Sequence, residues 1–176
     1  QGSDLQYSTD GTTFQALPAN TPIEFGGDKI LYLRGVNNLD GNFYESEGFK
    51  YGYKISFGKD DVPVACTGDI RTLIDYNTYK TVDTSNAIFV TLFEYCRELT
   101  SAPALPATTL AANCYKGMFY GCTSLKEAPV LPATTLAYRC YEQMFVGCTS
   151  LKEAPALPAT TLVDCCYSRM FHECTS

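Results

Sequence analysis

The sequence has one histidine, a deficit of positive charge and no long apolar run. Its 13 lysine and arginine residues against 19 aspartate and glutamate residues give a net charge of −6. Without a basic stripe nothing would neutralise a phosphate backbone, so the composition argues against nucleic acid as a partner. Because no run of about 18 apolar residues occurs, we expect no membrane span in this chain.

What the sequence does have is a 26-residue repeat in its second half. Copies begin at Leu105 and Leu131 and are identical at 20 of 26 positions, and a third copy begins at Leu157 and stops short at Ser176. A degenerate copy precedes them, with Leu92, Phe93, Cys96 and Leu99 in the positions of Met118, Phe119, Cys122 and Leu125. Such periods are typical of stacked units that bury their apolar faces only against neighbours.

Each repeat is predicted to contain a helix. Apolar residues of the second copy recur at steps of four or one, as expected along one side of a helix: Leu136, Cys140, Met144, Phe145 and Cys148. Thr134 and Thr135 precede this stripe as candidate N-caps, and Gly147 follows it as a C-terminal stop.

A short extended segment is predicted after each helix. Leu125, Ala128 and Leu131 have the spacing of a strand rather than of another helical turn. Pro129 and Pro132 lack an amide hydrogen, so any parallel strand here is expected to be brief. The repeats are therefore expected to form a right-handed solenoid of strand, turn and helix.

The first part of the chain differs in composition and is predicted to be a separate β-rich domain. Alternation from Phe49 to Phe57 predicts a strand with one buried face, and residues 29–34 predict another. Residues 5–14 are typical of a hairpin, because Asp10-Gly11 suits the turn. These strands favour a small β-sandwich.

These patterns predict three regions. Residues 1–67 form the sandwich-like domain. Residues 68–104 hold a short capping helix, from Gly68 to Tyr76, and the degenerate first repeat. Residues 105–176 hold the repeats, with bounds at 105–130, 131–156 and, for the partial copy, 157–176.

The order Met-Phe-x-Gly-Cys-Thr-Ser-Leu, Ala-Pro-x-Leu-Pro and Leu-x-x-x-Cys-Tyr resembles the BspA-like leucine-rich repeats of bacterial surface proteins over roughly residues 79–176. Ala128 and Ala154 stand where that family often has isoleucine. The β-region followed by repeats is similar to multidomain surface proteins of anaerobic gut bacteria. The resemblance implies an α+β chain, with a small β-sandwich before a right-handed leucine-rich-repeat solenoid. It also implies an extracellular or cell-surface location, with a signal segment removed before Gln1.

The nine cysteines fall mostly in two repeat positions, which predicts buried free thiols rather than disulfides. One position holds Cys114, Cys140 and Cys166, and the other holds Cys96, Cys122, Cys148 and Cys174. Cys66 and Cys165 are the exceptions. Disulfides or a metal site are the alternative.

His172, the only histidine, takes the repeat position of Tyr120 and Val146, which is typical of a tolerated surface substitution. Zinc ligation by His172 with Cys165, Cys166 and Cys174 is disfavoured, because the spacing matches no standard finger. A catalytic set would have to use His172 on a terminal coil, a poor place to hold catalytic geometry. We expect no enzyme activity, no cofactor and no metal.

Differences between the two complete repeats gather at one predicted helix face. Five of them are Ala112/Tyr138, Asn113/Arg139, Lys116/Glu142, Gly117/Gln143 and Tyr120/Val146. Candidate binding residues on this face are Lys116, Tyr120, Tyr138, Arg139, Glu142, Gln143, Arg169 and His172. Neutral variation of a solvated surface is the alternative, because exposed positions vary by default.

The leading expectation is a noncatalytic surface protein for adhesion or protein–protein interaction, with a protein or glycan of a host or bacterial surface as partner. The alternative is a carbohydrate-binding protein that uses aromatic residues within 43–57 of the β-domain. No C-terminal cap is visible after Ser176, so end-to-end self-association through the last repeat is a further expectation.

Overall fold

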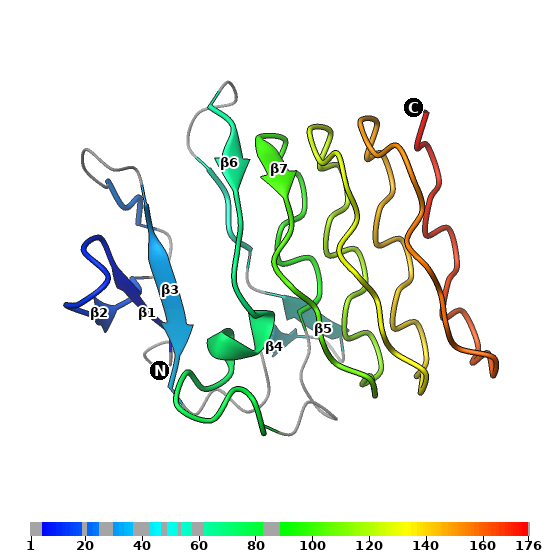
Figure 1. Ribbon diagram of the computed structural model, residues 1–176, viewed down its shortest axis with the longest axis horizontal. Coiled ribbons are helices and arrows are strands. Elements are labelled where there is room, and N and C mark those ends of the chain that lie inside the picture. Colours follow the sequence, from blue (N-terminus) through cyan, green and yellow to red (C-terminus); the bar gives the residue numbers. More distant parts are fainter. Residues whose placement is uncertain are drawn as a thin grey trace.

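The computed structural model describes residues 5–18, 21–24, 30–36, 43–46, 49–52, 54–57, 62–82 and 89–175. Stacked coils make up most of the molecule, with small sheets at the N-terminal end and the C-terminus on the last coil (Figure 1). Its strands are β1 (Leu5–Ser8), β2 (Gln15–Ala16), β3 (Tyr32–Gly35), β4 (Phe43–Ser46), β5 (Phe49–Gly52), β6 (Val64–Ala65) and β7 (Leu99–Ser101).

A three-stranded antiparallel sheet of order β2-β1-β3 forms the N-terminal end. The predicted hairpin is confirmed, although its second strand begins at Gln15, beyond the residues predicted. At its turn the Asp10 carboxylate accepts bonds from the amides of Thr12 and Thr13, both at 2.7 Å, and these bonds lower the pKa of Asp10. Such bonds are typical of an Asx turn.

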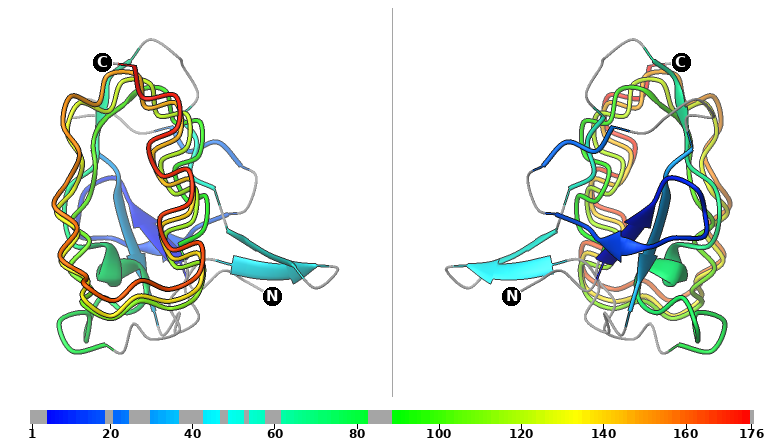
Figure 2. Two further views of the ribbon diagram at one scale, coloured as in Figure 1. Left: turned by 90° about the vertical axis from the view of Figure 1, so that its right-hand side faces the viewer. Right: turned by 90° about the vertical axis from the view of Figure 1, so that its left-hand side faces the viewer.

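Strands β4 and β5 pair as an antiparallel hairpin that projects sideways from the body (Figure 2). The predicted strand over 49–57 is present only as β5, and Lys54–Phe57 are not in a strand. A β-sandwich requires two sheets packed face to face. The strands β1–β3 and β4–β5 belong to two separate sheets, and the sandwich that would join them stays a prediction.

The prediction of one helix per repeat is wrong, and so is the helix-and-strand leucine-rich-repeat fold. Within the described residues the only helix is η1, a 3-10 helix over Ile70–Leu73. Where helices were expected, the chain runs in zigzag segments. These segments cover residues 89–96, 111–122, 137–148 and 163–174 and form the zigzag side of the stack (Figure 2).

Every fourth residue of a zigzag segment has a left-handed backbone, which reverses the chain locally. In the second complete coil these residues are Arg139 (φ 55), Gln143 (φ 57) and Gly147 (φ 69). For a residue other than glycine this conformation costs about 1–2 kcal/mol. A helix is therefore replaced only because other interactions compensate.

Hydrogen bonds between coils provide that compensation. Alternate amides donate to the next coil 25 residues on, as from Tyr115 to Cys140 at 2.9 Å. The amides between them close tight turns within the coil, as from Met118 to Tyr115 at 3.2 Å. Since each inter-coil bond joins residues distant in sequence, no local pattern alone produces this backbone.

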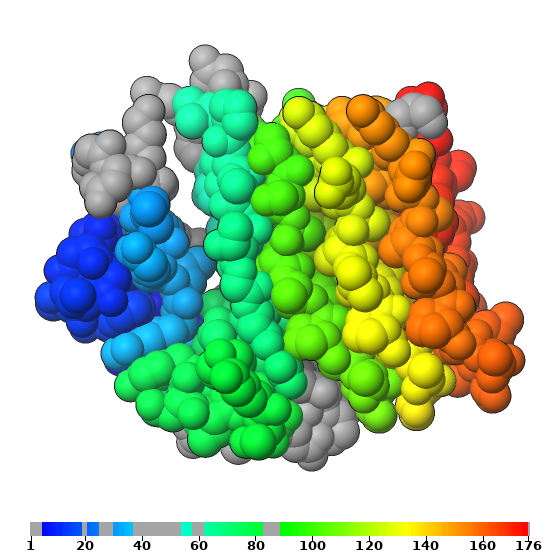
Figure 3. Space-filling model, viewed as in Figure 1, coloured from blue at the N-terminus to red at the C-terminus, as the bar shows by residue number. Residues whose placement is uncertain are grey.

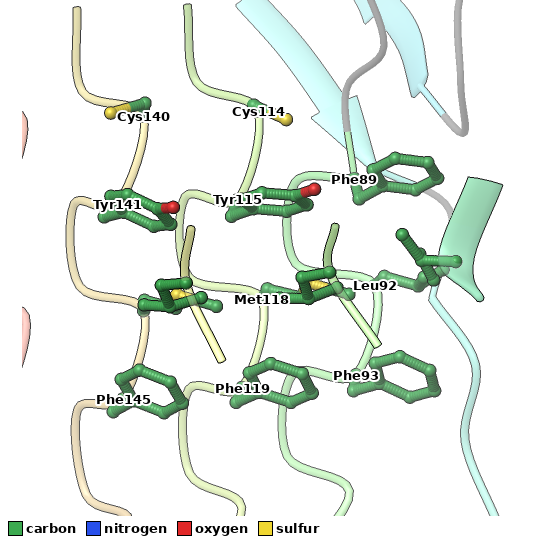
Figure 4. Packing of buried hydrophobic residues seen from close by; sticks show 14 of the residues in the cluster. Phe89, Leu92, Phe93, Cys114, Tyr115, Met118, Phe119, Cys140, Tyr141 and Phe145 are labelled. Carbon is green, nitrogen blue, oxygen red and sulfur yellow. The ribbon is translucent and has the colours of Figure 1, made fainter. Parts of the chain in front are cut away.

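The core consists of rows of identical or similar side chains stacked through the coils. Figure 4 shows one row of Phe89, Tyr115 and Tyr141 and another of Phe93, Phe119 and Phe145. The rings of the second row are nearly parallel, and the centroids of neighbouring rings are 5.7 Å apart. Met118 and Met144 are fully buried beside them. The predicted stacking of repeats against one another is thus confirmed, although the backbone differs.

One cysteine of each coil ties it to the coil before. The thiols of Cys122 and Cys148 each donate to a phenylalanine carbonyl 29 residues earlier, at 3.1 Å. Cys174 makes the same bond to Phe145. All nine cysteines are free, and six are buried, so the prediction of buried free thiols in the repeat positions is confirmed.

The opposite, extended side of the stack consists of residues 99–105, 125–131 and 151–157, which lie side by side as bands in Figure 3. A strand appears here only in the first of them, where β7 pairs with β6 in parallel. The strand predicted over 125–131 is absent. The aligned Pro103, Pro129 and Pro155 cannot donate to a ladder, which keeps any strand on this side short.

The first coil is closed by residues from the N-terminal half. Ile55 donates its amide to the Leu92 carbonyl at 2.7 Å and accepts from the Cys96 thiol at 2.8 Å. η1 follows β6 along the chain, and the Ile70 amide donates a hydrogen bond to the Ala104 carbonyl at 3.1 Å. The predicted capping helix is therefore present as a short 3-10 turn whose Ile70 and Leu73 are buried.

The N-terminal sheet docks on η1 through β3. The Tyr76 amide donates to the Gly35 carbonyl at 3.1 Å. The Arg34 guanidinium lies between two rings, 3.6 Å from the centroid of Phe14 and 4.0 Å from that of Tyr76. Close approach at Gly35 needs glycine, since a Cβ there would lie 1.9 Å from the Leu73 carbonyl oxygen.

The last zigzag segment, 163–174, presents backbone amide groups, and over residues 163–172 no unpaired carbonyl group, along its outer edge. The carbonyls of 163–172 all accept bonds from the preceding coil or within the segment. Its outward amides have no acceptor in the described part of the chain; they belong to Cys165, Tyr167, Arg169, Phe171 and Glu173. A coil that covers this edge must therefore offer carbonyl groups.

Candidate binding surface

The candidate residues of the sequence lie on the zigzag side, where two neighbouring coils bring three of them together. The Lys116 Nζ lies 2.9 Å from the Glu142 carboxylate of the next coil, and the Arg139 Nε lies 3.6 Å from the same carboxylate. Tyr138 joins this group, with the Arg139 guanidinium 4.8 Å from its ring centroid. The result is a partly exposed patch with an aromatic edge.

The other candidates do not join that patch. Gln143 and Arg169 are equivalent residues of successive coils, both left-handed. Tyr120 packs edge-on against Tyr95, with ring centroids 5.3 Å apart. His172 is exposed and lies 3.4 Å from the Glu173 carboxylate. Four of the eight residues thus form the charged patch, Gln143 and Arg169 form a second pair, Tyr120 belongs to a tyrosine cluster with Tyr95, and His172 stands apart.

The tyrosine cluster borders an open groove of about 380 Å³. Its floor is Gly121 and Gly147, and Tyr95 and Tyr120 form one wall. Tyr95 is 53% exposed. The groove is also lined by Val146, Thr123, Arg97 and Glu173.

Tyr95 is fixed from several directions. Its ring occupies the space above Gly121, where a Cβ would lie 2.5 Å from a ring carbon. The Lys54 Nζ lies 5.5 Å from its ring centroid and pairs with Glu94. A side chain held in this way loses little freedom when a ligand stacks on it.

The sequence did not predict this groove, and Tyr120 is the only residue of its lining among the candidate binding residues. A signal was available in the repeat position that holds Tyr95, Gly121, Gly147 and Glu173. Two small residues between two large ones, aligned across coils, predict a hollow. The prediction of Gly147 as the end of a helix concealed this signal.

A second, smaller groove of about 250 Å³ lies on the extended side. Proline and alanine line most of it, with Pro129, Pro132 and Pro155 from two coils. Val130 beside them is 79% exposed. The lining offers apolar contact and few hydrogen-bonding groups.

Thiol chemistry at the buried cysteines is suppressed by their surroundings. Burial raises the pKa of Cys96 and of Cys148 to about 12, from an ordinary value of 9.0. Burial likewise raises the pKa of Cys114 and Cys122. Since the thiolate is the reactive form, these cysteines are poor nucleophiles and poor metal ligands.

The free energy of unfolding is expected to fall as the pH rises above 9. There the unfolded thiols lose protons that the folded thiols keep, up to the folded pKa of about 12. Each such thiol lowers stability by at most about 1.4 kcal/mol per pH unit in this window. Urea titrations at pH 8, 9 and 10 measure the slope.

Cys148→Ala is the control for that slope, because it removes one buried thiol and should flatten the dependence on pH while lowering stability at every pH. Ellman titration adds an independent check, with the repeat-position thiols reacting fast only after denaturation. Constant stability from pH 8 to 10, or fast reaction of the repeat-position thiols in the folded protein, would contradict the buried-thiol ladder.

No three side chains of His, Cys, Asp or Glu converge as a metal site among the residues that the structure describes. Within the same ranges, no helix has the length and apolar character to cross a membrane. Comparisons with protein-family models, with curated proteins and with solved structures find no match to this chain.

Proposed function

We propose that this chain is a noncatalytic binding module of the cell-surface adhesion or protein-interaction kind, and that the zigzag side of the stack binds the partner. One observation carries the proposal: a constant backbone displays different outward side chains on successive coils. Tyr115, Tyr141 and Tyr167 stack as one inner row. At an outward position the same coils carry Lys116, Glu142 and Ser168.

This arrangement separates stability from recognition. Buried columns and inter-coil hydrogen bonds hold the coils, so outward residues can differ without loss of the fold. The patch of Tyr138, Arg139, Lys116 and Glu142 combines an aromatic ring with charges of both signs. Tyrosine and arginine are enriched among residues that dominate protein interfaces.

The cell-surface location in this proposal derives from the resemblance of the repeats to bacterial surface proteins. Self-association through the last coil stays a separate prediction. Because two donor-only edges cannot pair with each other through their backbones, it requires carbonyl groups from another part of the partner copy.

Capture from host-surface and bacterial extracts with the immobilised full chain tests the proposal. The double variant Lys116→Ser, Tyr138→Ser should capture at least tenfold less of any bound protein, because it removes a charge and a ring from the patch. Both residues are away from the buried columns, so the change in stability is expected to stay within about 1 kcal/mol.

The matched control is Lys126→Ser, Lys152→Ser on the extended side, where both lysines are exposed. It removes two charges and should leave capture unchanged. Equal loss in both double variants would mean nonspecific charge attraction, and equal capture by wild type and patch variant would refute a role for the zigzag side.

A further inference from the structure

The tyrosine groove has features that the proposed function does not explain. Left-handed backbone alone does not require glycine at its floor, because Tyr95 (φ 61) and Glu173 (φ 61) occupy the same repeat position with the same conformation. Gly121 has a packing reason, namely the ring of Tyr95 above it. Gly147 has no such reason.

Space is available above Gly147. A Cβ there would meet nothing nearer than the Gly121 Cα at 3.8 Å, which is ordinary contact. The equivalent space one coil earlier, above Gly121, is filled by the ring of Tyr95. Glycine at 147 thus leaves a hollow beside Tyr95, at the centre of the groove.

The polar groups around this hollow are available to a ligand. Among the described residues, no hydrogen bond or ion pair engages the side chains of Arg97 and Thr123. Arg97 contributes donors, Thr123 a hydroxyl group and Glu173 a carboxylate acceptor. Tyrosine rings supply an apolar wall with polar tips.

Charge around the groove disfavours an ionic ligand. Arg97 and Glu173 have opposite signs. A cation stacked on Tyr95 would meet Lys54, which already lies 5.5 Å from that ring centroid. An anion would meet Glu173, and the Glu94 carboxylate pairs with the Lys54 that lies over the Tyr95 ring.

We propose that the groove above Gly147 binds one neutral hexose unit of a glycan, with the sugar ring against Tyr95 and Tyr120 and its hydroxyl groups bonded by Arg97, Thr123 and Glu173. This rests on the proposed binding function and names a ligand class for a separate part of the same side. A volume of about 380 Å³ is at the small end for ligand sites. Affinity for a free monosaccharide is accordingly millimolar.

Titration of the ¹⁵N-labelled full chain with the methyl glycosides of glucose, galactose, mannose and N-acetylglucosamine, up to 50 mM, tests the proposal by NMR. At least one should shift the amide signals of Gly121 and Gly147 and saturate. N-acetylneuraminic acid and lysine methyl ester serve as charged probes. Binding of a charged probe alone would overturn the assignment to a neutral sugar, and so would the absence of any saturable shift.

Gly147→Asn should weaken sugar binding at least tenfold, because it fills the hollow with a residue that tolerates a left-handed backbone. Gln143→Asn is its matched control, since it places the same side chain at a left-handed position of the same coil outside the groove. The control should change affinity less than twofold. Equal loss in both variants would contradict the site.

Arg97→Gln gives a second test that does not depend on backbone tolerance, and it should weaken binding three- to tenfold. Unchanged affinity in this variant would remove Arg97 from the site. The two proposals fail separately: Gly147→Asn should keep the protein capture that Lys116→Ser, Tyr138→Ser loses. That double variant in turn should keep sugar binding.

Discussion

Phe119→Ala is expected to lower the free energy of unfolding by about 3–5 kcal/mol. The Phe119 ring is fully buried and stacks on Phe93 and Phe145, at 5.7 Å on both sides. Its removal leaves a cavity between two coils that cannot collapse, because hydrogen bonds fix their separation. Urea unfolding followed by circular dichroism measures the loss.

Two variants calibrate this expectation. Phe171→Ala changes the same column at the outer coil, where the ring stacks on Phe145 alone and is only partly buried, so it should cost about half as much. Tyr138→Ala on the surface should stay within about 0.5 kcal/mol. A loss below 1 kcal/mol for Phe119→Ala would show that the column does not support the stack.

Gly35→Ala is expected to separate the N-terminal sheet from the stack. A Cβ at this position would lie 1.9 Å from the Leu73 carbonyl oxygen and 2.9 Å from that of Ile74, and both are backbone atoms. β3 must therefore move, which breaks the bond from the Tyr76 amide and the stacking of Arg34. Overpacking and the lost bond together cost on the order of 3 kcal/mol.

Limited proteolysis and calorimetry detect this separation. Cleavage between the sheet and the stack should accelerate at least tenfold, and a separate low-temperature transition should appear. Val36→Ala, at an exposed neighbouring position, should change neither. A single transition with unchanged proteolysis in Gly35→Ala would show that the sheet and the stack do not depend on this contact.

The helix error has a specific cause in the spacing of apolar residues. Leu136, Cys140, Met144 and Cys148 are each four residues apart, a spacing longer than the roughly 3.6 residues of a helical turn. A zigzag that reverses every fourth residue has a period of four. The same period places most of the variable positions on the zigzag side, although the described part of that side contains no helix and Val146 is buried.

The candidate site was predicted only in part. The charged patch could be found because Lys116, Arg139 and Glu142 differ from their counterparts in the other copy. The groove could not be found in this way, because Gly121 and Gly147 are identical in both complete copies. Its wall comes from Tyr95 in the degenerate copy, and only the stacking of coils places that ring above Gly121.

By itself the sequence determined the 26-residue period, the inward rows of aromatic and cysteine residues and the interruption of strands by proline. These follow from apolar burial and from a missing amide hydrogen, which are properties of the residues themselves. Only the tertiary structure decided the backbone between those positions. Left-handed residues such as Arg139 are unfavourable alone, and they are stabilised because alternate amides reach carbonyl groups 25 residues away in the next coil.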